Sequence, residues 1–221
     1  MTDGPGSAAG PRVVGLTGGI ATGKSTFSAA LRAQGAPVID ADALARAAVA
    51  RGSPGLSAVV AAFGPGVLGP DGELDRKRIA TLVFADPAAR ARLEAIVHPD
   101  VRARFERERD ALGAAGHRLA FYDVPLLYEA RRERDVELVV VVWAPRAVQL
   151  ARLMARDGLD RAAAEARLAA QLPVDDKAAR ADAVIVNDGD PSELPGKARR
   201  LLADLASGLG RRLHNAPAPR Y

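Results

Sequence analysis

Residues 18–25 read Gly18-Gly19-Ile20-Ala21-Thr22-Gly23-Lys24-Ser25 and match the pattern G-x-x-x-x-G-K-[ST], which in folded proteins joins a strand to a helix. The apolar run before it, Arg12-Val13-Val14-Gly15-Leu16-Thr17, predicts a buried strand, and residues 26–34 predict a helix. A second short apolar run, Pro37-Val38-Ile39-Asp40, then predicts another strand. Strand, glycine loop, helix and strand in this order predict a βαβ unit.

The rest of the chain holds one long helical region and further strands. Residues 41–116 show apolar positions at helical spacing and no convincing strand. Further strands are predicted at residues 119–123, 136–143 and 183–187, and helices at residues 147–172 and 191–205. We therefore predict an α/β fold of the P-loop NTPase class: a three-layer core with a five-stranded parallel sheet, a helical insertion and a small lid.

These patterns also predict how the chain is divided. We expect a disordered leader over residues 1–11, a nucleotide-binding core over residues 12–42 and 117–206 with a lid at about residues 146–180, a helical insertion over residues 43–116, and a flexible tail over residues 207–221. With 221 residues and 48% apolar residues, the chain is long enough for one elaborated domain with a packed core.

Composition excludes several classes of site. The chain contains no cysteine, which excludes disulfides, thiolate zinc sites, cysteine nucleophiles and iron–sulfur clusters. It contains only three histidines, which argues against a histidine metal cluster. The net charge is +4, but the basic residues are interspersed with acidic ones, so we expect no nucleic-acid partner. Neither a membrane-length apolar run nor a signal-peptide pattern is present, so we expect no membrane partner and a cytoplasmic location.

The glycine-rich loop has a specific chemical use. Its glycines allow successive backbone N–H groups to point inward around a polyphosphate, and the following helix adds the positive end of its dipole. Lys24 is then expected to reach the β- and γ-phosphates, while the Ser25 hydroxyl binds Mg²⁺. We therefore predict a site for a nucleoside triphosphate with Mg²⁺, made by Gly18, Gly19, Ile20, Ala21, Thr22, Gly23, Lys24, Ser25 and Thr26.

Three acidic residues follow predicted strands, where open α/β sheets bind ligands. Asp40 is placed to accept the proton of an acceptor hydroxyl; alternatively Asp40 holds Mg²⁺ through water and Asp42 is the base. Asp123 ends an apolar strand, as in a Walker B element, and is expected to bind magnesium, the alternative being a helix cap.

A phosphate loop alone does not separate a GTPase switch from a kinase. The segment Asn187-Asp188-Gly189-Asp190 lacks the lysine of the guanine-binding motif, which disfavours a GTPase. The short chain and its helical insertion favour a kinase for a small acceptor. A kinase for another small alcohol or a slow switch protein remain alternatives. One or two of the arginines before the last strand are expected to cover the transferring phosphoryl group, the candidates being Arg146, Arg152, Arg156, Arg161 and Arg167.

Taken together, the motifs resemble the dephospho-coenzyme A kinases over about residues 13–205. The matching stretches are Leu16-Thr17-Gly18-Gly19-Ile20, Lys24-Ser25-Thr26, Asp40-Ala41-Asp42 with Ala45-Arg46, Gly72-Glu73-Leu74-Asp75-Arg76, Val83-Phe84, Leu93-Glu94-Ala95-Ile96-Val97-His98-Pro99, Asp123-Val124-Pro125-Leu126-Leu127-Tyr128-Glu129, Gln149-Leu150-Ala151-Arg152-Leu153, Arg156-Asp157, Gln171, Ala181-Asp182 and Asn187. Two departures are mild: Ala21 stands where the family usually has glycine, and Trp143 where a smaller or polar residue is common.

The resemblance implies transfer of the ATP γ-phosphate to the 3′-hydroxyl of the ribose of dephospho-CoA. We also expect Mg²⁺ as cofactor, as the phosphate loop predicts, and a monomer. The resemblance implies that Asp40 is the base, that Lys24 and Arg156 act in catalysis, and that Asn187 lies near the adenine of ATP. It further implies that the helical insertion binds the acceptor, with Asp42, Arg46 and His98 as acceptor-binding residues, although a lone histidine such as His98 by itself fits a structural role as well.

Overall fold

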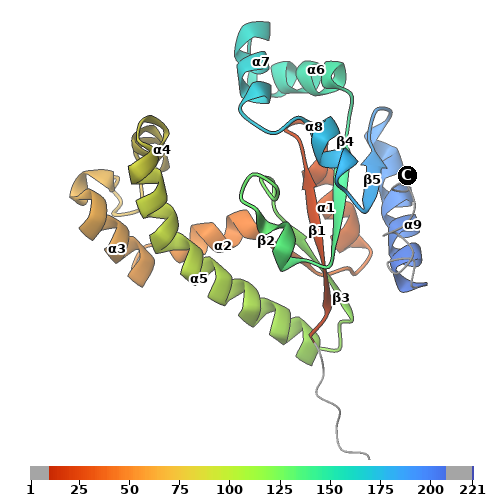
Figure 1. Ribbon diagram of the computed structural model, residues 1–221, viewed down its shortest axis with the longest axis horizontal. Helices are drawn as coiled ribbons and strands as arrows, with labels where there is room; N and C mark the ends of the chain where they lie inside the picture. The colour runs from red at the N-terminus through yellow and green to blue at the C-terminus, as the bar shows by residue number, and fades with distance from the viewer. Residues whose placement is uncertain (1–9, 208–220) are drawn as a thin grey trace, which may run out of the picture. The chain divides into compact units, whose positions relative to one another are not determined.

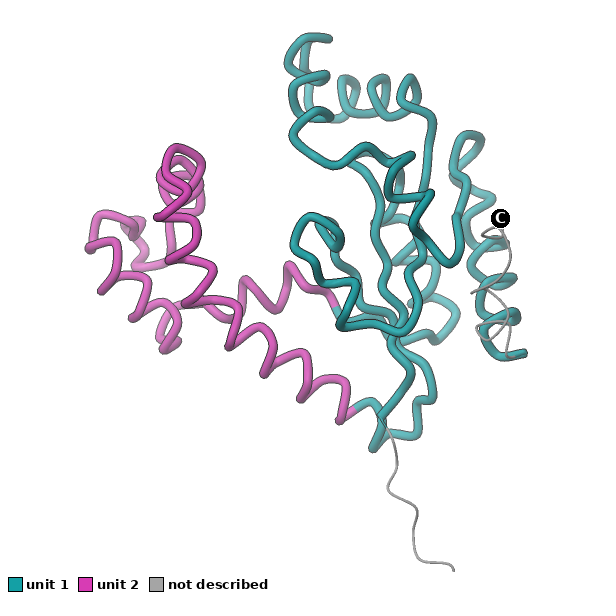
Figure 2. The backbone as a smooth tube through the Cα atoms, in the orientation of Figure 1, with its two compact units in different colours: residues 1–39, 112–221 teal, residues 40–111 magenta. Residues whose placement is uncertain are grey.

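The computed structural model describes residues 10–207 and Tyr221. The chain forms two compact units, shown in different colours in Figure 2. The first contains the chain up to Ile39 together with the chain from Leu112 onward, and the second contains residues 40–111. Asp40 and Asp42, which the sequence placed at the end of the core, are therefore grouped with the second unit.

The first unit is built around a five-stranded sheet (Figure 1). Its strands are β1 (Arg12–Gly18), β2 (Val38–Asp40), β3 (Leu119–Asp123), β4 (Leu138–Trp143) and β5 (Ala183–Val186), in the order β2-β3-β1-β4-β5. The pairs β1–β3, β1–β4 and β4–β5 are parallel. Sequence-distant neighbours in a parallel sheet require crossover connections, which the helices supply. The predicted five-stranded α/β core is confirmed.

Helices bury the central strands on one face by contributing apolar side chains at helical spacing. One core cluster joins helices α1 (Lys24–Ala33) and α9 (Leu194–Ala206) to alternate residues of β1, β4 and β5. The helices contribute Phe27 and Leu31 from α1, and Leu194, Ala198 and Leu201 from α9. Alternation places every second strand residue on this face. Because the strands are almost continuously buried, they appear in the sequence as apolar runs without alternation.

The segment between β4 and β5 contains the basic helical stretch predicted over residues 147–172, and it is divided into three helices. It forms α6 (Arg146–Asp157), α7 (Arg161–Ala169) and the short α8 (Val174–Ala179). Gly158 ends α6 in the left-handed conformation with φ of 64°, which glycine adopts without steric penalty. Apolar side chains of α6 and α7, among them Leu153 and Ala164, form a separate small core cluster. The predicted helical character of residues 147–172 is thus confirmed, whereas the breaks between the helices were not predicted, because a lone glycine also occurs inside helices, at a cost of about 1 kcal/mol.

The second unit consists of helices α2 (Ala41–Ala48), α3 (Pro54–Phe63), α4 (Arg76–Ala85) and α5 (Pro87–Ala114), the last of which continues into the first unit. Val59, Val67 and Ile79 centre its core cluster. The side chains of Asp40, Ser53 and Asp75 cap α2, α3 and α4, respectively, by accepting bonds from their first amide groups. Apart from one isolated bridge between Leu68 and Leu74, residues 41–116 form no strand, as predicted.

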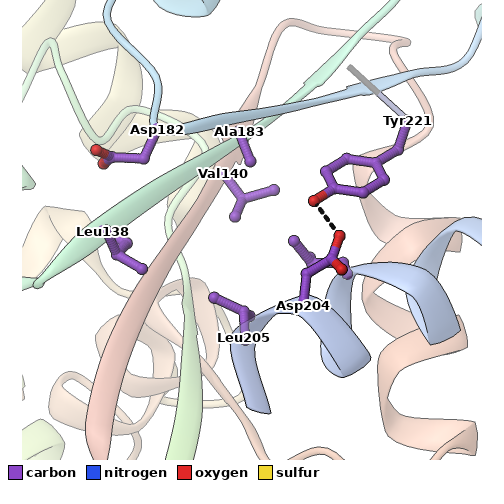
Figure 3. A pocket seen from close by; sticks show the side chains of 8 residues that line it. Leu138, Val140, Asp182, Ala183, Asp204, Leu205 and Tyr221 are labelled. Atoms are coloured by element: carbon purple, nitrogen blue, oxygen red, sulfur yellow. Dashed lines mark hydrogen bonds between the residues drawn. The ribbon is translucent and has the colours of Figure 1, made fainter. Parts of the chain in front are cut away.

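The predicted leader and tail fall largely outside the described residues, which exclude 1–9 and 208–220. Tyr221 is described and lies beside β5, where its N–H donates to the Val184 carbonyl and its carbonyl accepts from Val186 N–H. Its hydroxyl donates to Asp204 of α9, over a small apolar recess lined by Leu138 and Val140 (Figure 3). Among the described residues, no helix has the length and apolar character needed to cross a membrane.

Candidate active site

The phosphate-loop sequence connects β1, which ends at Gly18, to α1, which begins at Lys24. The loop is closed by Thr22, whose N–H and hydroxyl both donate to the Gly19 carbonyl, at 3.3 and 2.9 Å. Gly23 occupies the N-cap position of α1 and supplies no capping side chain. The first amide groups of α1 are therefore directed toward the place where an anion binds at a helix N-terminus.

The turn into α1 needs glycine at position 23. Gly23 has φ of 91°, and a Cβ there would lie 2.2 Å from Nδ2 of Asn187. Ala21 has φ of 59°, in the left-handed region where an L-residue is held at a cost of about 1–2 kcal/mol. The backbone at position 21 thus suits the glycine that the resemblance leads one to expect there. Ser25 and Thr26, the remaining predicted loop residues, are exposed in the first turn of α1.

Lys24 and Asp123 form an ion pair, which brings together two residues that the sequence proposed for different ligands. Asp123 ends β3 and pairs in register with Leu16 of β1, so it lies at the edge of the sheet where β1 leads into the phosphate loop that ends at Lys24. Both are largely buried, with 14% of the Lys24 side chain and 8% of the Asp123 side chain exposed. A charge-assisted bond of this kind holds the ammonium group in a defined place before any phosphate binds.

Asn187 follows β5 and supports the phosphate loop directly. Its buried side chain donates through Nδ2 to the Thr22 carbonyl at 2.7 Å, and its backbone N–H donates to Trp143. The Asn187 carbonyl in turn accepts from Arg152 at 3.0 Å. Arg152, one of the arginines considered for the transferring phosphoryl group, is therefore engaged with the backbone after β5.

Arg156 lies on the exposed surface of α6. It bonds Asp157 at 2.7 Å, and Arg167 of α7 reaches the other oxygen of the same carboxylate at 2.5 Å. The hydrogen bond with Asp157 raises the pKa of Arg156, and that bond is also the main reason why the pKa of Asp157 lies below its usual value. Arg161 pairs with Glu165 within α7. Arg146 instead lines a cavity of about 350 Å³ that also includes Gly19, Ile20, Gln149, Gln171 and Asp175.

Three polar contacts of buried or partly buried side chains near this loop were not predicted from the sequence. Gln171 accepts through Oε1 from Ile20 N–H at 3.0 Å, and Gln149 donates to the Ala144 carbonyl at 2.8 Å. Lys177 of α8 is completely buried and pairs with Glu129 at 2.8 Å. One signal was available: Lys177 is one of only four lysines in a chain with 31 basic residues, where arginine is otherwise the rule.

The remaining predicted site residues belong to the second unit. Asp40 accepts from Ala43 N–H through Oδ1 at 3.0 Å and so caps α2, which also carries Asp42. Arg46 lies on α2 and, with Glu73 and Arg76, lines a cavity of about 360 Å³ within this unit. His98 is exposed on α5, next to Pro99, and does not line that cavity.

Comparisons with known proteins agree with one another. A sequence model of the family described as dephospho-CoA kinase matches residues 12–193. The dephospho-CoA kinase of Anaeromyxobacter dehalogenans (strain 2CP-C) is 66% identical over 210 residues, 95% of this chain and 100% of that protein, and the dephospho-CoA kinase of Geobacter sulfurreducens is 50% identical over 86% of this chain and 97% of that protein.

Two solved structures are also similar to this chain. The dephospho-CoA kinase from Campylobacter jejuni is similar with a TM-score of 0.67 and 28% identity, over 89% of this chain and 98% of that one. The crystal structure of TT1252 from Thermus thermophilus is similar with a TM-score of 0.76 and 38% identity, over 89% of this chain and 99% of that one. The family model matches most of this chain, and a relative named for this activity is 66% identical to it. The chain therefore belongs to the dephospho-CoA kinase family.

Proposed function

We propose that this protein transfers the γ-phosphate of ATP to the 3′-hydroxyl of the ribose of dephospho-CoA, which yields coenzyme A and ADP. The observation that carries the proposal is the loop between β1 and α1, with Lys24 at its end already paired with Asp123, in a chain that belongs to this family. Kinases of this class rely on positioning and on electrostatic stabilisation of a phosphoryl group, and the loop supplies both.

In this mechanism Lys24 exchanges part of its contact with Asp123 for the β- and γ-phosphates and stabilises the charge of the transferring group. The Ser25 hydroxyl and the Asp123 carboxylate are the proposed protein ligands of Mg²⁺, which fits the preference of this cation for few protein oxygens beside substrate phosphates. Bound Mg²⁺ would neutralise charge on the phosphate oxygens. Arg156 is proposed to reach the transferring group after it leaves Asp157.

Asp40 is the proposed base. It is the last residue of β2, which neighbours β3 in the sheet, so Asp40 and Asp123 end adjacent strands. Its Oδ1 caps α2, and Oδ2 is therefore the oxygen we propose for the acceptor proton. The cap holds the carboxylate in one orientation, as a base must be held. Asp42, the alternative base, lies in the first turn of α2.

The second unit is proposed to bind the acceptor, through Asp42, Arg46 and His98. The cavity lined by Arg46, Arg76 and Glu73 offers two cations beside one carboxylate, and the two cations are proposed to bind the anionic phosphates of a coenzyme A precursor. Hydrogen exchange tests this assignment: dephospho-CoA should slow exchange over residues 40–111, and ATP alone should not. Protection of this unit by ATP but not by dephospho-CoA would contradict it.

The reaction itself is tested by an ADP-release assay coupled to a dehydrogenase, with a panel of acceptors. ADP formation that requires dephospho-CoA supports the proposal. Turnover only with another alcohol or nucleotide would favour a different small-molecule kinase, and ADP release without any acceptor dependence would favour a slow hydrolase or switch. Sedimentation of the same preparation checks the expected monomer.

A further inference from the structure

Lys177 is the most deeply buried cation among the described residues, and its Nζ atom contacts three oxygen atoms, one at the end of β1 and two in the segment that follows β3. It lies 2.8 Å from Oε1 of Glu129, 3.2 Å from the Pro125 carbonyl and 3.3 Å from the Gly18 carbonyl. An ammonium group has three N–H donors, so these three acceptors account for all of them. Such a group acts as a fixed junction rather than as a mobile surface charge.

The two carbonyls belong to the chain segments that carry the phosphate-binding groups. Gly18 is the last residue of β1, directly before the loop that leads to Lys24. Pro125 follows Asp123 closely and also accepts from the Thr17 hydroxyl at 3.0 Å. The ammonium of Lys177 therefore joins the end of β1 to the chain after β3, the two segments from which Lys24 and Asp123 meet.

Glu129 extends the junction to the segment between α7 and α8. The Oε1 atom that receives Lys177 also accepts from Leu172 N–H at 3.1 Å. The preceding residue, Gln171, accepts from Ile20 N–H in the phosphate loop. The loop and the segment that returns from α7 are thus connected twice, once through Gln171 and once through Glu129 and Lys177.

We propose that Lys177 is a positioning residue for phosphoryl transfer: by holding the Gly18 and Pro125 carbonyls on one ammonium group, it sets the spacing between Lys24 and Asp123 at which the phosphates of ATP bind. The proposal rests on the proposed function for its catalytic consequence. Lys177 itself does not touch the reacting atoms. Glu129 supplies the counter-charge and transmits the arrangement to the segment after α7.

The competing explanation is that Lys177 and Glu129 only stabilise the fold. The two explanations predict different results for a double variant. Removal of one charge of a buried ion pair destabilises the protein, whereas removal of both charges restores much of that stability. Removal of both charges does not restore a bridge between the Gly18 and Pro125 carbonyls. A variant that regains stability without regaining phosphate-site geometry is therefore expected only if Lys177 positions the loop.

The test uses Lys177→Met, which keeps length and removes the donors, Glu129→Gln, and the combination of both. Lys197→Met is a matched control, because Lys197 also donates to a strand-end carbonyl, that of Val186 at 2.7 Å, and pairs with a glutamate, Glu193. Urea unfolding gives the stability of each variant, and steady-state kinetics are measured where all variants remain folded.

We expect Lys177→Met to lower kcat about 10- to 100-fold and to change the KM for dephospho-CoA by less than about threefold. The reason is that loss of the ammonium group alters the spacing of Lys24 and Asp123 more than it alters the binding of the acceptor. Glu129→Gln should lower kcat less, because the ammonium bridge survives. The double variant should regain stability but not kcat. Recovery of kcat together with stability, or an equal loss of kcat in Lys197→Met, would overturn the proposal.

A second readout does not depend on turnover. Trp143 is the single tryptophan of the chain, and its Nε1–H donates to Asp175 of α8 at 2.6 Å, so its emission reports on the helix that carries Lys177. Titration with ATP in the absence of acceptor should give an ATP Kd raised at least about fivefold in the double variant and unchanged in Lys197→Met. An unchanged ATP Kd in the double variant would contradict the positioning role of Lys177. Because ATP binding is measured without turnover, this result holds whether or not dephospho-CoA is the acceptor, so failure of this inference is distinguishable from failure of the proposed function.

Discussion

Buried ion pairs between distant segments distinguish the first compact unit from the second, although the first unit also holds exposed local pairs such as Arg161–Glu165. In the first unit, Lys24–Asp123 and Lys177–Glu129 are buried pairs between distant segments; the first joins residues 99 positions apart. The second unit instead holds local pairs between residues no more than four positions apart, with at least 28% of each side chain exposed, namely Arg78–Asp75, Arg90–Glu94, Arg102–Glu106, Arg104–Asp100 and Arg109–Asp110. Buried pairs organise a site, whereas exposed helix pairs contribute little to stability.

This contrast implies that single substitutions have large effects at the buried ion pairs of the first unit and small effects at the exposed local pairs of the second. Asp40 is the expected exception, because it belongs to the second unit but is held at the end of a strand of the sheet.

Asp40→Asn should produce the largest effect. Asparagine keeps the size of the side chain and its ability to cap α2, but it does not accept the proton of the acceptor hydroxyl, so kcat should fall about 10²- to 10⁴-fold. ATP affinity should barely change. Steady-state kinetics of Asp40→Asn and Asp42→Asn, each titrated against Mg²⁺, are the measurement. Rescue of Asp40→Asn by excess Mg²⁺, or loss of activity in Asp42→Asn alone, would assign the base to Asp42.

Lys24→Ala should lower kcat about 10²- to 10³-fold, because it removes the positive charge that stabilises the transferring phosphoryl group. It also leaves Asp123 buried without its counter-charge, so the free energy of unfolding should decrease as well. Kinetics at saturating ATP, together with urea unfolding, measure both effects. A variant that keeps more than about a tenth of the wild-type kcat would contradict the role of the loop in phosphoryl transfer.

Tyr128→Phe should change the response to alkaline pH. Burial is the main cause that raises the pKa of Tyr128 to about 12, against the opposing effect of Arg180, which lies 4.0 Å from the centre of its ring. Because the folded-state pKa is raised, the contribution of Tyr128 to stability is complete below about pH 10 and is lost as the pH rises toward 12.

The phenylalanine variant lacks this titration, so its urea midpoint should decline less between about pH 8 and pH 11 than that of the wild type. At neutral pH the cost should be small, since the buried Tyr128 hydroxyl has no hydrogen-bond partner within the described part of the chain. Identical decline of the two proteins with pH would contradict the burial argument.

Arg90→Ala should have the smallest effect. Arg90 and Glu94 are paired one turn apart on α5 with 65% and 43% of their side chains exposed, so the loss should be about 0.2–0.5 kcal/mol. Urea unfolding and kcat are measured beside the wild type. A loss of stability or of kcat comparable with that of Lys24→Ala would show that the exposed ion pairs of the second unit contribute as much as the buried pairs of the first.

Local patterns in the sequence were sufficient for the elements of the core. The glycine-rich loop, the apolar runs of β1, β3, β4 and β5, and the helical spacing of residues 41–116 depend on neighbours a few positions apart, and side-chain periodicity records such relations directly. The division of residues 146–179 into α6, α7 and α8 was missed, because a lone glycine does not by itself reveal that a helix ends.

The partners of the buried groups were settled only by the tertiary structure. Lys177 meets the Gly18 carbonyl from 159 positions away, and Asn187 meets the Thr22 carbonyl from 165 positions away. These hydrogen bonds depend on the strand order β2-β3-β1-β4-β5 and on the register of each pair of neighbouring strands, which together place the ends of β1, β3 and β5 at one edge of the sheet. Residue type and spacing show that Lys24, Asp123 and Asn187 lie at or near the ends of strands. The contacts between them form only when the sheet assembles. The energy of each long-range contact depends on burial and on a geometry that no local segment contains.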